Sequence, residues 1–276
     1  MKGQMTNGVQ NIRFKKAYLW LKFLLIFALT VAILVLTALS PLFNISSIEV
    51  IGNGHYEERD IVEASGIVAG SNGFKTIGNS FINFFTLRYG NAEERILKLL
   101  PYIKDVEARF IIPSTVRINV SERKPMAAVP YLGTNLIIDD EGYVLDTVVN
   151  SDSGLPAVKG LKFEDFELGQ ALKVDNRKSL DQVIKLMKAI YDSDMNDKFK
   201  LGEIIDSIDA SAEDKICVFI DSRIVANLGS LENLNYRISV LKHVLLKNLK
   251  KEDKGLLDFT VGQNPVFMPD AKVSDN

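Results

Sequence analysis

Side chains suited to acid–base or metal chemistry are scarce in this sequence. Its 276 residues include two histidines and one cysteine. We predict that His55, in a turn, and His243, on the polar side of an expected helix, are surface imidazoles. Cys217 falls in an apolar strand pattern, where a thiol is most simply a small buried hydrophobic group. No serine or cysteine has a histidine and an acidic partner in a motif typical of nucleophilic catalysis.

Three further clusters also lack the pattern that chemistry would require. Asp139-Asp140-Glu141 does not have the spacing of a calcium loop, and aspartates are favoured in hairpin turns. No Gly-Lys-Ser/Thr follows the glycines between Gly66 and Gly78, so they do not form a phosphate loop. The lysines of the last expected helix are predicted to line its solvated side and end, namely Lys242, Lys247, Lys250, Lys251 and Lys254. We therefore expect no catalytic residue, no metal site, no cofactor and no small-molecule substrate.

The distribution of charge indicates a membrane protein. Residues 1–40 carry five basic side chains and no acidic one. The rest of the chain therefore holds 28 of the 33 basic residues against all 35 acidic ones, a net charge of −7. A basic head on an acidic body argues against nucleic acid as a partner of the larger portion. The single cysteine excludes a disulfide framework.

One apolar segment is long enough to cross a bilayer. We predict a basic cytoplasmic tail over residues 1–16 and a transmembrane helix over residues 17–40. About 23 residues at 1.5 Å each span roughly 35 Å, more than a hydrocarbon core of about 30 Å. Tyr18 and Trp20 suit the interface, and the basic residues before the span place everything after Pro41 outside the cytoplasm. A cleaved signal peptide is the alternative, but the apolar run is too long and Pro41 would follow the cleavage site.

Two small domains are expected after the span. Residues 44–123 predict an α+β module in which Asn91 and Glu94 form a helix-capping box. Its elements are, in order, strand 45–50, helices 57–65 and 91–100, and strands 106–110 and 116–120. Residues 124–268 predict a mixed β domain with two helices, one capped at Ser179 and one at Ser230. Its strands are expected at 127–131, 136–138, 143–145, 155–160, 204–208, 216–220, 224–227 and 256–261, and residues 269–276 form a flexible tail.

These elements resemble those of a known family. The stretch Val50-Ile51-Gly52-Asn53 is similar to the opening of a POTRA domain, and Leu99-Leu100-Pro101-Tyr102-Ile103 to its second helix and exit. The run from Pro113 to Pro125 resembles the close of that domain in the FtsQ/DivIB cell-division proteins. Asp140–Leu145 and Leu155–Gly160 are similar to the start of the family's β domain. The chain departs from the family at Asp221-Ser222, where glycine is common, and in a long loop from Asn79 to Gly90.

The resemblance implies a βααββ POTRA module followed by a β domain whose C-terminal part docks a partner. Applied here, it implicates five residues that our pattern places in or after the last strand, namely Leu257, Phe259, Val261, Val266 and Phe267. That strand, 256–261, comes last and is expected at a sheet edge, where open backbone groups accept a strand from another chain. The alternative is that all five residues only close the core.

The resemblance further implies a non-enzymatic, single-pass scaffold of the bacterial division complex, the divisome. Such a protein binds bitopic coiled-coil division proteins (FtsL-like and FtsB/DivIC-like) and through them the septal peptidoglycan synthesis machinery. It is expected in the cell membrane at the division septum. Two alternatives remain open. One is a POTRA protein of envelope assembly or secretion, which normally carries repeated modules or a barrel, and the other is a membrane-anchored envelope hydrolase.

Overall fold

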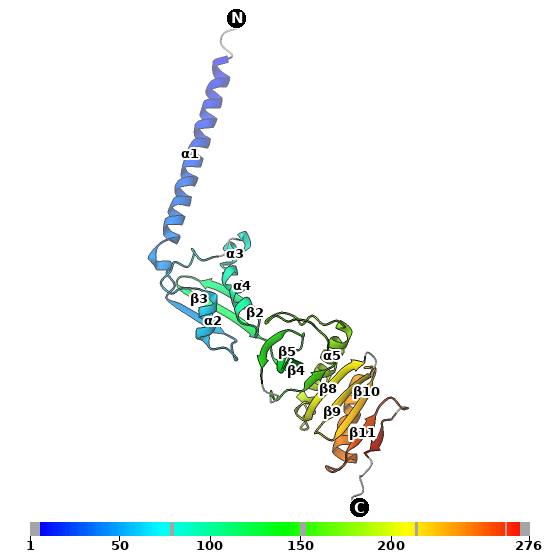
Figure 1. Cartoon of the computed structure of the whole chain (residues 1–276). Coiled ribbons are helices and arrows are strands. Elements are labelled where there is room, and N and C mark those ends of the chain that lie inside the picture. Colours follow the sequence, from blue (N-terminus) through cyan, green and yellow to red (C-terminus); the bar gives the residue numbers. More distant parts are fainter. Residues whose placement is uncertain (1–5, 78–79, 150–152, 213–214, 263, 271–276) are drawn as a thin grey trace, which may run out of the picture. The chain divides into compact units, whose positions relative to one another are not determined.

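The computed structural model describes residues 6–77, 80–149, 153–212, 215–262 and 264–270. They divide into two compact units. The first holds the described residues through Ile96 together with Asp105–Val120, and the second holds Leu97–Lys104 and the described residues from Ser121 onward. The predicted fold class is confirmed: an apolar helix, a small α+β module and a larger mixed sheet with two helices (Figure 1). The exact domain boundaries given above stay predictions.

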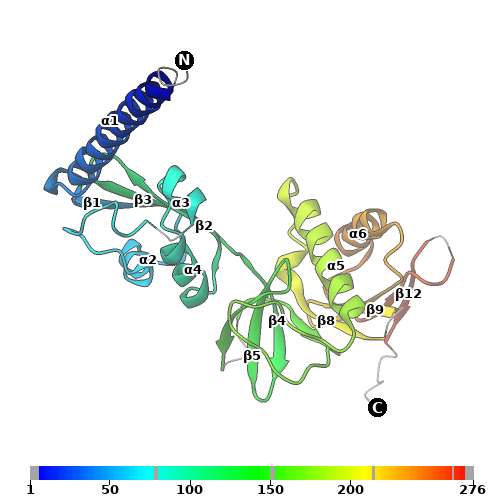
Figure 2. The same cartoon turned by 90° about the horizontal axis from the view of Figure 1, so that it is seen from above.

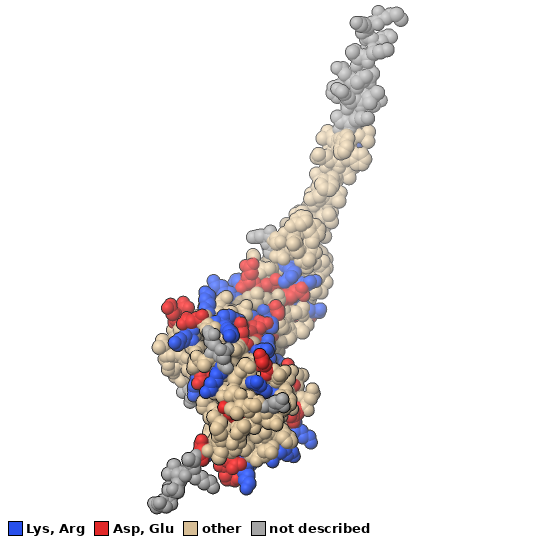
Figure 3. All heavy atoms as spheres, turned by 90° about the vertical axis from the view of Figure 1, so that its right-hand side faces the viewer, with Lys and Arg blue, Asp and Glu red and all other residues tan. Residues whose placement is uncertain are grey.

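The first helix, α1, spans Thr6–Ala38. Its stretch Tyr18–Ala38, 21 residues long, is apolar and long enough to cross a membrane. Thr30 and Thr37 donate their hydroxyls to carbonyls one turn earlier, at 2.9 and 2.8 Å, so these two polar groups are satisfied inside the helix. In Figure 3 the described part of α1 is an almost unbroken tan rod, whereas acidic and basic groups mingle on the visible face of the rest.

A three-stranded sheet with two main helices follows α1 and makes up the small α+β module. The elements are the 3₁₀ turn η1 (Pro41–Phe43), β1 (Ser47–Ile51), α2 (Glu58–Ser65), α3 (Phe81–Thr86), α4 (Gly90–Leu99), β2 (Ile103–Ile111) and β3 (Thr115–Glu122). The strand order is β1-β3-β2, with β1 parallel to β3. The alternating positions of β3 that we expected inside, Val116, Ile118 and Val120, are buried. The βααββ order holds, with α3 as an additional short helix.

The expected capping box of α4 is wrong. The helix begins at Gly90, so Asn91 lies inside it. The acidic residue that holds this helix in place is Glu93, which is buried. Its carboxylate accepts from the Ala108 amide at 2.8 Å and from the Arg88 guanidinium at 2.7 Å. Because the Glu93 carboxylate in the first turn of α4 accepts from the neighbouring strand β2, it fixes this helix to the sheet.

A nine-stranded sheet forms the second unit, in the order β12-β11-β10-β9-β8-β7-β4-β5-β6. The strands are β4 (Pro125–Tyr131), β5 (Thr134–Asp139), β6 (Val144–Val148), β7 (Ala157–Lys159), β8 (Ile205–Ala212), β9 (Lys215–Ile220), β10 (Ile224–Gly229), β11 (Gly255–Asp258) and β12 (Val266–Pro269). The helices are α5 (Arg177–Met195) and α6 (Leu234–His243), with a 3₁₀ turn η2 (Gly202–Ile204) and a π turn η3 (Val244–Asn248). Parallel pairs join β4 to β7, β7 to β8, and β10 to β11.

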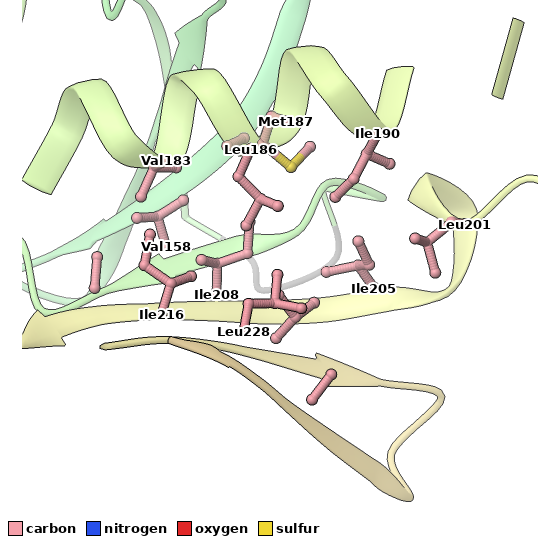
Figure 4. Close-up of a cluster of buried hydrophobic side chains, with 14 of the residues drawn as sticks. Val158, Val183, Leu186, Met187, Ile190, Leu201, Ile205, Ile208, Ile216 and Leu228 are labelled. Atoms are coloured by element: carbon pink, nitrogen blue, oxygen red, sulfur yellow. The ribbon is translucent and has the colours of Figure 1, made fainter. Parts of the chain in front are cut away.

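The core of this unit lies between the sheet and the helices. Figure 2 shows α5 and α6 side by side over the sheet. In Figure 4 the side chains of Val183, Leu186 and Ile190 on α5 point at Ile205, Ile208 and Leu228 of the strands. The helical stripe predicted from Leu180 to Ile190 is therefore a core face.

Both expected helix starts in this unit are wrong. The N-cap of α5 is Asn176, whose side chain accepts from the Lys178 amide at 3.1 Å, and Ser179 is buried inside the helix. The second helix begins at Leu234, after a left-handed Asn233, and not at Ser230. The reason is that Ser and Asn cap helices almost equally well, so the sequence alone does not decide between neighbouring candidates.

Candidate partner-binding edge of the large sheet

The open edge of the large sheet is not the strand that the sequence indicated. We expected strand 256–261 at the edge, but β11 ends at Asp258 and lies between β10 and β12. The chain turns back after Val261, and residues 266–269 pair antiparallel with β11. The edge is therefore β12, and the expectation for 256–261 is corrected.

The backbone pattern shows which groups of β12 face outward. The amide of Gly255 donates to the carbonyl of Arg223, just before β10, and the amide of Phe259 to that of Asn227 in β10. On the other side, the amide of Asp270 donates to the Lys254 carbonyl at 2.9 Å. Antiparallel partners alternate between bonded and non-bonded pairs, so Phe267, opposite Leu257, turns its N–H and C=O away from β11. Pro265 and Pro269 lack an N–H, and they limit the open stretch of backbone to the residues between them.

The five predicted partner-binding residues fall into two groups. Leu257 and Phe259 are buried, Leu257 with only 1% of its surface exposed, and they belong to the core. Val261 and Val266 are exposed, at 57% and 44%, and Phe267 packs against the core from its rim. Sequence analysis missed Met268, which is exposed and lies two residues after Val266, on the same face of β12.

A hydrogen-bonded carboxylate fixes the strand behind this edge. Asp258, buried, accepts from the Thr260 amide and hydroxyl, both at 2.7 Å, and from the Asn227 side chain at 3.3 Å. The Thr260 bonds, with a smaller share from Asn227, lower the pKa of Asp258 even though burial opposes this. The carboxylate therefore ties β10, β11 and the turn before β12 together.

The opposite edge of the sheet, β6, is partly covered. Val144 at its start donates to Gln170 and accepts from Gly169, and Tyr143 forms a bridge with Ala171. A loop across an edge strand occupies the groups that a partner strand would need. The two edges are thus different, and β12 is the less protected.

The other groups singled out in the sequence lie at surface or structural positions. His243 is exposed and His55 packs edge-on against Tyr56. Cys217 is half-buried, and burial raises the pKa of its thiol, which disfavours the reactive thiolate. Asp139 and Glu141 both accept from Arg123, at 2.6 and 2.9 Å. Among the described residues, no three His, Cys, Asp or Glu side chains are placed to hold a metal ion.

The prediction that Lys242 lies on the solvated side of its helix is wrong. Its ammonium group is buried and lies 2.7 Å from Asp194 and 3.1 Å from Asp197. Burial alone would lower the pKa of Lys242, but the hydrogen bonds and charges of the two carboxylates outweigh it and raise the pKa. Lys247 and Lys250 are exposed as expected.

Comparison with known proteins identifies the first module. The model of the FtsQ-type POTRA domain matches residues 43–123. The cell division protein DivIB of Clostridium botulinum strain Hall is 26% identical over 252 residues, which cover 89% of this chain and 90% of that protein. DivIB of Clostridium acetobutylicum is 26% identical over 231 residues, covering 82% and 83%. The cell division protein FtsQ of Corynebacterium glutamicum is 26% identical over 171 residues, covering 61% and 66%.

Among solved structures, the major extracytoplasmic domain of the trans isomer of DivIB from Geobacillus stearothermophilus is similar. It is 15% identical, with a TM-score of 0.29, and the match covers 47% of this chain and 99% of that chain. The POTRA match agrees with the order of elements described above. The two DivIB proteins, which align over most of their length, are each named as division proteins. The chain thus carries an FtsQ-type POTRA domain and is similar over most of its length to bacterial cell-division proteins of the DivIB and FtsQ type.

Proposed function

We propose that this chain is a non-enzymatic, single-pass scaffold of the division complex that captures a strand of a partner protein at the β12 edge. Residues 1–16 lie in the cytoplasm, and the two folded domains after the membrane span lie outside it, at the septum. The partners are bitopic coiled-coil division proteins, FtsL-like and FtsB/DivIC-like, which couple the scaffold to septal peptidoglycan synthesis. The relatives' role in division supports the setting, and the geometry of β12 supports the mechanism.

The observation that carries the proposal is the outward-facing backbone of Phe267 on an edge strand. A partner strand that pairs with β12 gains hydrogen bonds from this backbone and apolar contact from Val266, Met268 and Val261, which are exposed. The two flanking prolines keep the receptive stretch short, and this disfavours uncontrolled edge-to-edge aggregation. Binding of this kind is an equilibrium and needs no covalent step.

The proposed division of labour follows the predicted boundaries. Residues 17–40 anchor the protein, residues 44–123 form the POTRA module, and residues 124–268 form the β domain that captures the partner. Leu257 and Phe259 contribute indirectly, because they hold β11 in the core, against which β12 pairs. A charged residue at Phe259 is expected to unfold the domain, so it does not test binding cleanly.

The test is co-purification of partners with the full-length chain from membranes of the bacterium that encodes it. The variant Val266→Lys/Met268→Lys places two charges on the exposed face of β12, and we expect it to lose at least about tenfold in partner recovery, equivalent to about 1.4 kcal/mol. The matched control is Val149→Lys, an exposed valine just after β6 at the other edge. Wild-type recovery by a folded Val266→Lys/Met268→Lys variant would refute capture at β12.

A further inference from the structure

The short helix α3 carries an apolar patch that is open to solvent. Its six residues include no charged side chain. Phe81, Ile82, Phe84 and Phe85 are all exposed, with 79% of Phe81 and 69% of Phe85 accessible. The ring of Phe85 lies 4.7 Å from that of Phe81 and 5.7 Å from that of Phe84, measured between centroids. The three rings therefore form one continuous surface, and we call these rings together with Ile82 the α3 patch.

The α3 patch is held firmly by the fold. The Arg88 amide donates to Asn83 at 2.9 Å, closing the end of the helix, and Leu87 accepts from the Phe110 amide of β2 at 2.9 Å. The next residue but one, Tyr89, donates its amide to Ala108 of β2, also at 2.9 Å. These bonds fasten the C-terminal end of α3 to the sheet, so its exposed rings are presented by a fixed element.

The segment that leads into α3 is bound to the end of the membrane span. The Asn72 side chain donates to the carbonyl of Ala38, the last residue of α1, at 2.9 Å. The adjacent Phe74 packs edge-on against Phe43 of η1, with ring centroids 5.2 Å apart. Exposed Leu39 and Leu42 continue the apolar surface of α1 beyond its last turn. The point where the chain leaves the membrane is thus part of the same folded unit as α3.

We propose that the α3 patch inserts into the interface of the same membrane that α1 spans, on the side where the folded units lie. Phenylalanine-rich, uncharged helix faces favour the boundary between headgroups and acyl chains, and an exposed lysine, Lys75, precedes the patch. A lipid surface is the occupant that fits, because the patch offers no charge for a polar partner and belongs to the same folded unit as the end of α1, to which Asn72 bonds. The proposal rests on α1 spanning the membrane, as proposed above, and it adds a second contact that restrains the POTRA module on the bilayer.

The test uses the fluorescence of one tryptophan in the full-length chain, placed as a single copy in each lipid nanodisc. Trp20 is the natural tryptophan of the chain, and its quenching by lipid brominated near the top of the acyl chain reports whether α1 is inserted. In the variant Trp20→Phe/Phe85→Trp, the new indole reports on the α3 patch. The control Trp20→Phe/Tyr236→Trp places it at an exposed ring on α6, between Asn235 and Arg237.

We expect the emission of the Phe85→Trp protein to shift to the blue and to fall by roughly half in brominated lipid, because interfacial helices bury their apolar face about 5–10 Å deep. The Tyr236→Trp protein should show neither change. If the indole at position 85 emits like that of the Tyr236→Trp control, the proposal is overturned. A blue shift without quenching by the brominated lipid would also overturn it, because the ring would then be covered by protein and not by lipid. If wild-type Trp20 itself is not quenched, the anchor has failed instead, and the two failures are distinguished.

Discussion

Replacing Lys242 should destabilise the second unit more than any other single change to a lysine that we have described. The Lys242 side chain is only 6% exposed, and its ammonium donates to the Ser193 carbonyl at 3.0 Å as well as pairing with Asp194 and Asp197. Asp194 in turn accepts from the amides of Leu201 and Gly202, at 3.0 and 2.8 Å. One buried cation therefore joins α6 to the end of α5 and to the start of η2.

The substitution Lys242→Met keeps the apolar stem and removes the charge. Losing one partner of a buried ion pair costs about 3–5 kcal/mol, because the remaining charge stays buried. Asp194 keeps its two backbone donors, so we expect the lower end, about 3 kcal/mol in the free energy of unfolding. Adding Asp194→Asn should recover part of this loss, since the orphaned charge is then removed.

Hydrogen exchange of the full-length chain in detergent micelles measures this loss where it occurs. Amides of β9, in the centre of the unit, should exchange on the order of 100-fold faster in Lys242→Met than in wild type, as about 3 kcal/mol requires. The matched control is Lys247→Met, because Lys247 is exposed on η3. If β9 exchanges less than about tenfold faster, or no faster than in the control, the reasoning about the buried pair is refuted.

Three further changes test the remaining contacts. Gly52→Ala should cost about 2 kcal/mol or more of stability, seen as faster exchange of β1 and β3 amides, because φ is +94° and a Cβ would lie 2.1 Å from the Val120 carbonyl oxygen. Burial raises the pKa of Tyr89 to about 12, so the phenol ionises more readily in the unfolded chain. The free energy of unfolding of wild type should therefore fall by about 2 kcal/mol between pH 10 and 12. Denaturant titrations of Tyr89→Phe should not show that fall. Because the pKa of Asp258 is lowered in the folded protein, its carboxylate stabilises the fold above the ordinary pKa of 3.8, and this stabilisation is lost as the pH falls through the lower folded pKa. The variant Asp258→Asn should lack that part of the loss of stability in acid. An acid-unfolding profile equal to that of wild type would contradict this prediction.

Periodic patterns in the sequence predicted the elements that form the cores. The alternation at Val116, Ile118 and Val120 fixed which face of β3 is inside, because side chains of a strand alternate between faces. The stripe along α5 was predicted for the same reason at helical spacing. By contrast, α3 was missed because Phe, Ile, Asn and Thr are moderate helix formers and six residues give too short a pattern.

The candidate site depended on pairings that sequence patterns do not encode. The edge was misplaced by one strand, because β12 is four residues long and is defined by its partner β11 rather than by its own pattern. Its flanking prolines were a usable signal, since proline in a strand is typical of an edge. Lys242 was misjudged because its acidic partners lie 45 and more residues earlier in the chain and approach it only in the folded unit.

The most direct test of the account is where the protein lies in living cells. A fluorescent protein fused before residue 1 leaves both folded units and the β12 edge unaltered. The account predicts fluorescent bands at mid-cell in dividing cells, coincident with new septal peptidoglycan. A signal spread evenly around the membrane throughout the cell cycle would contradict it.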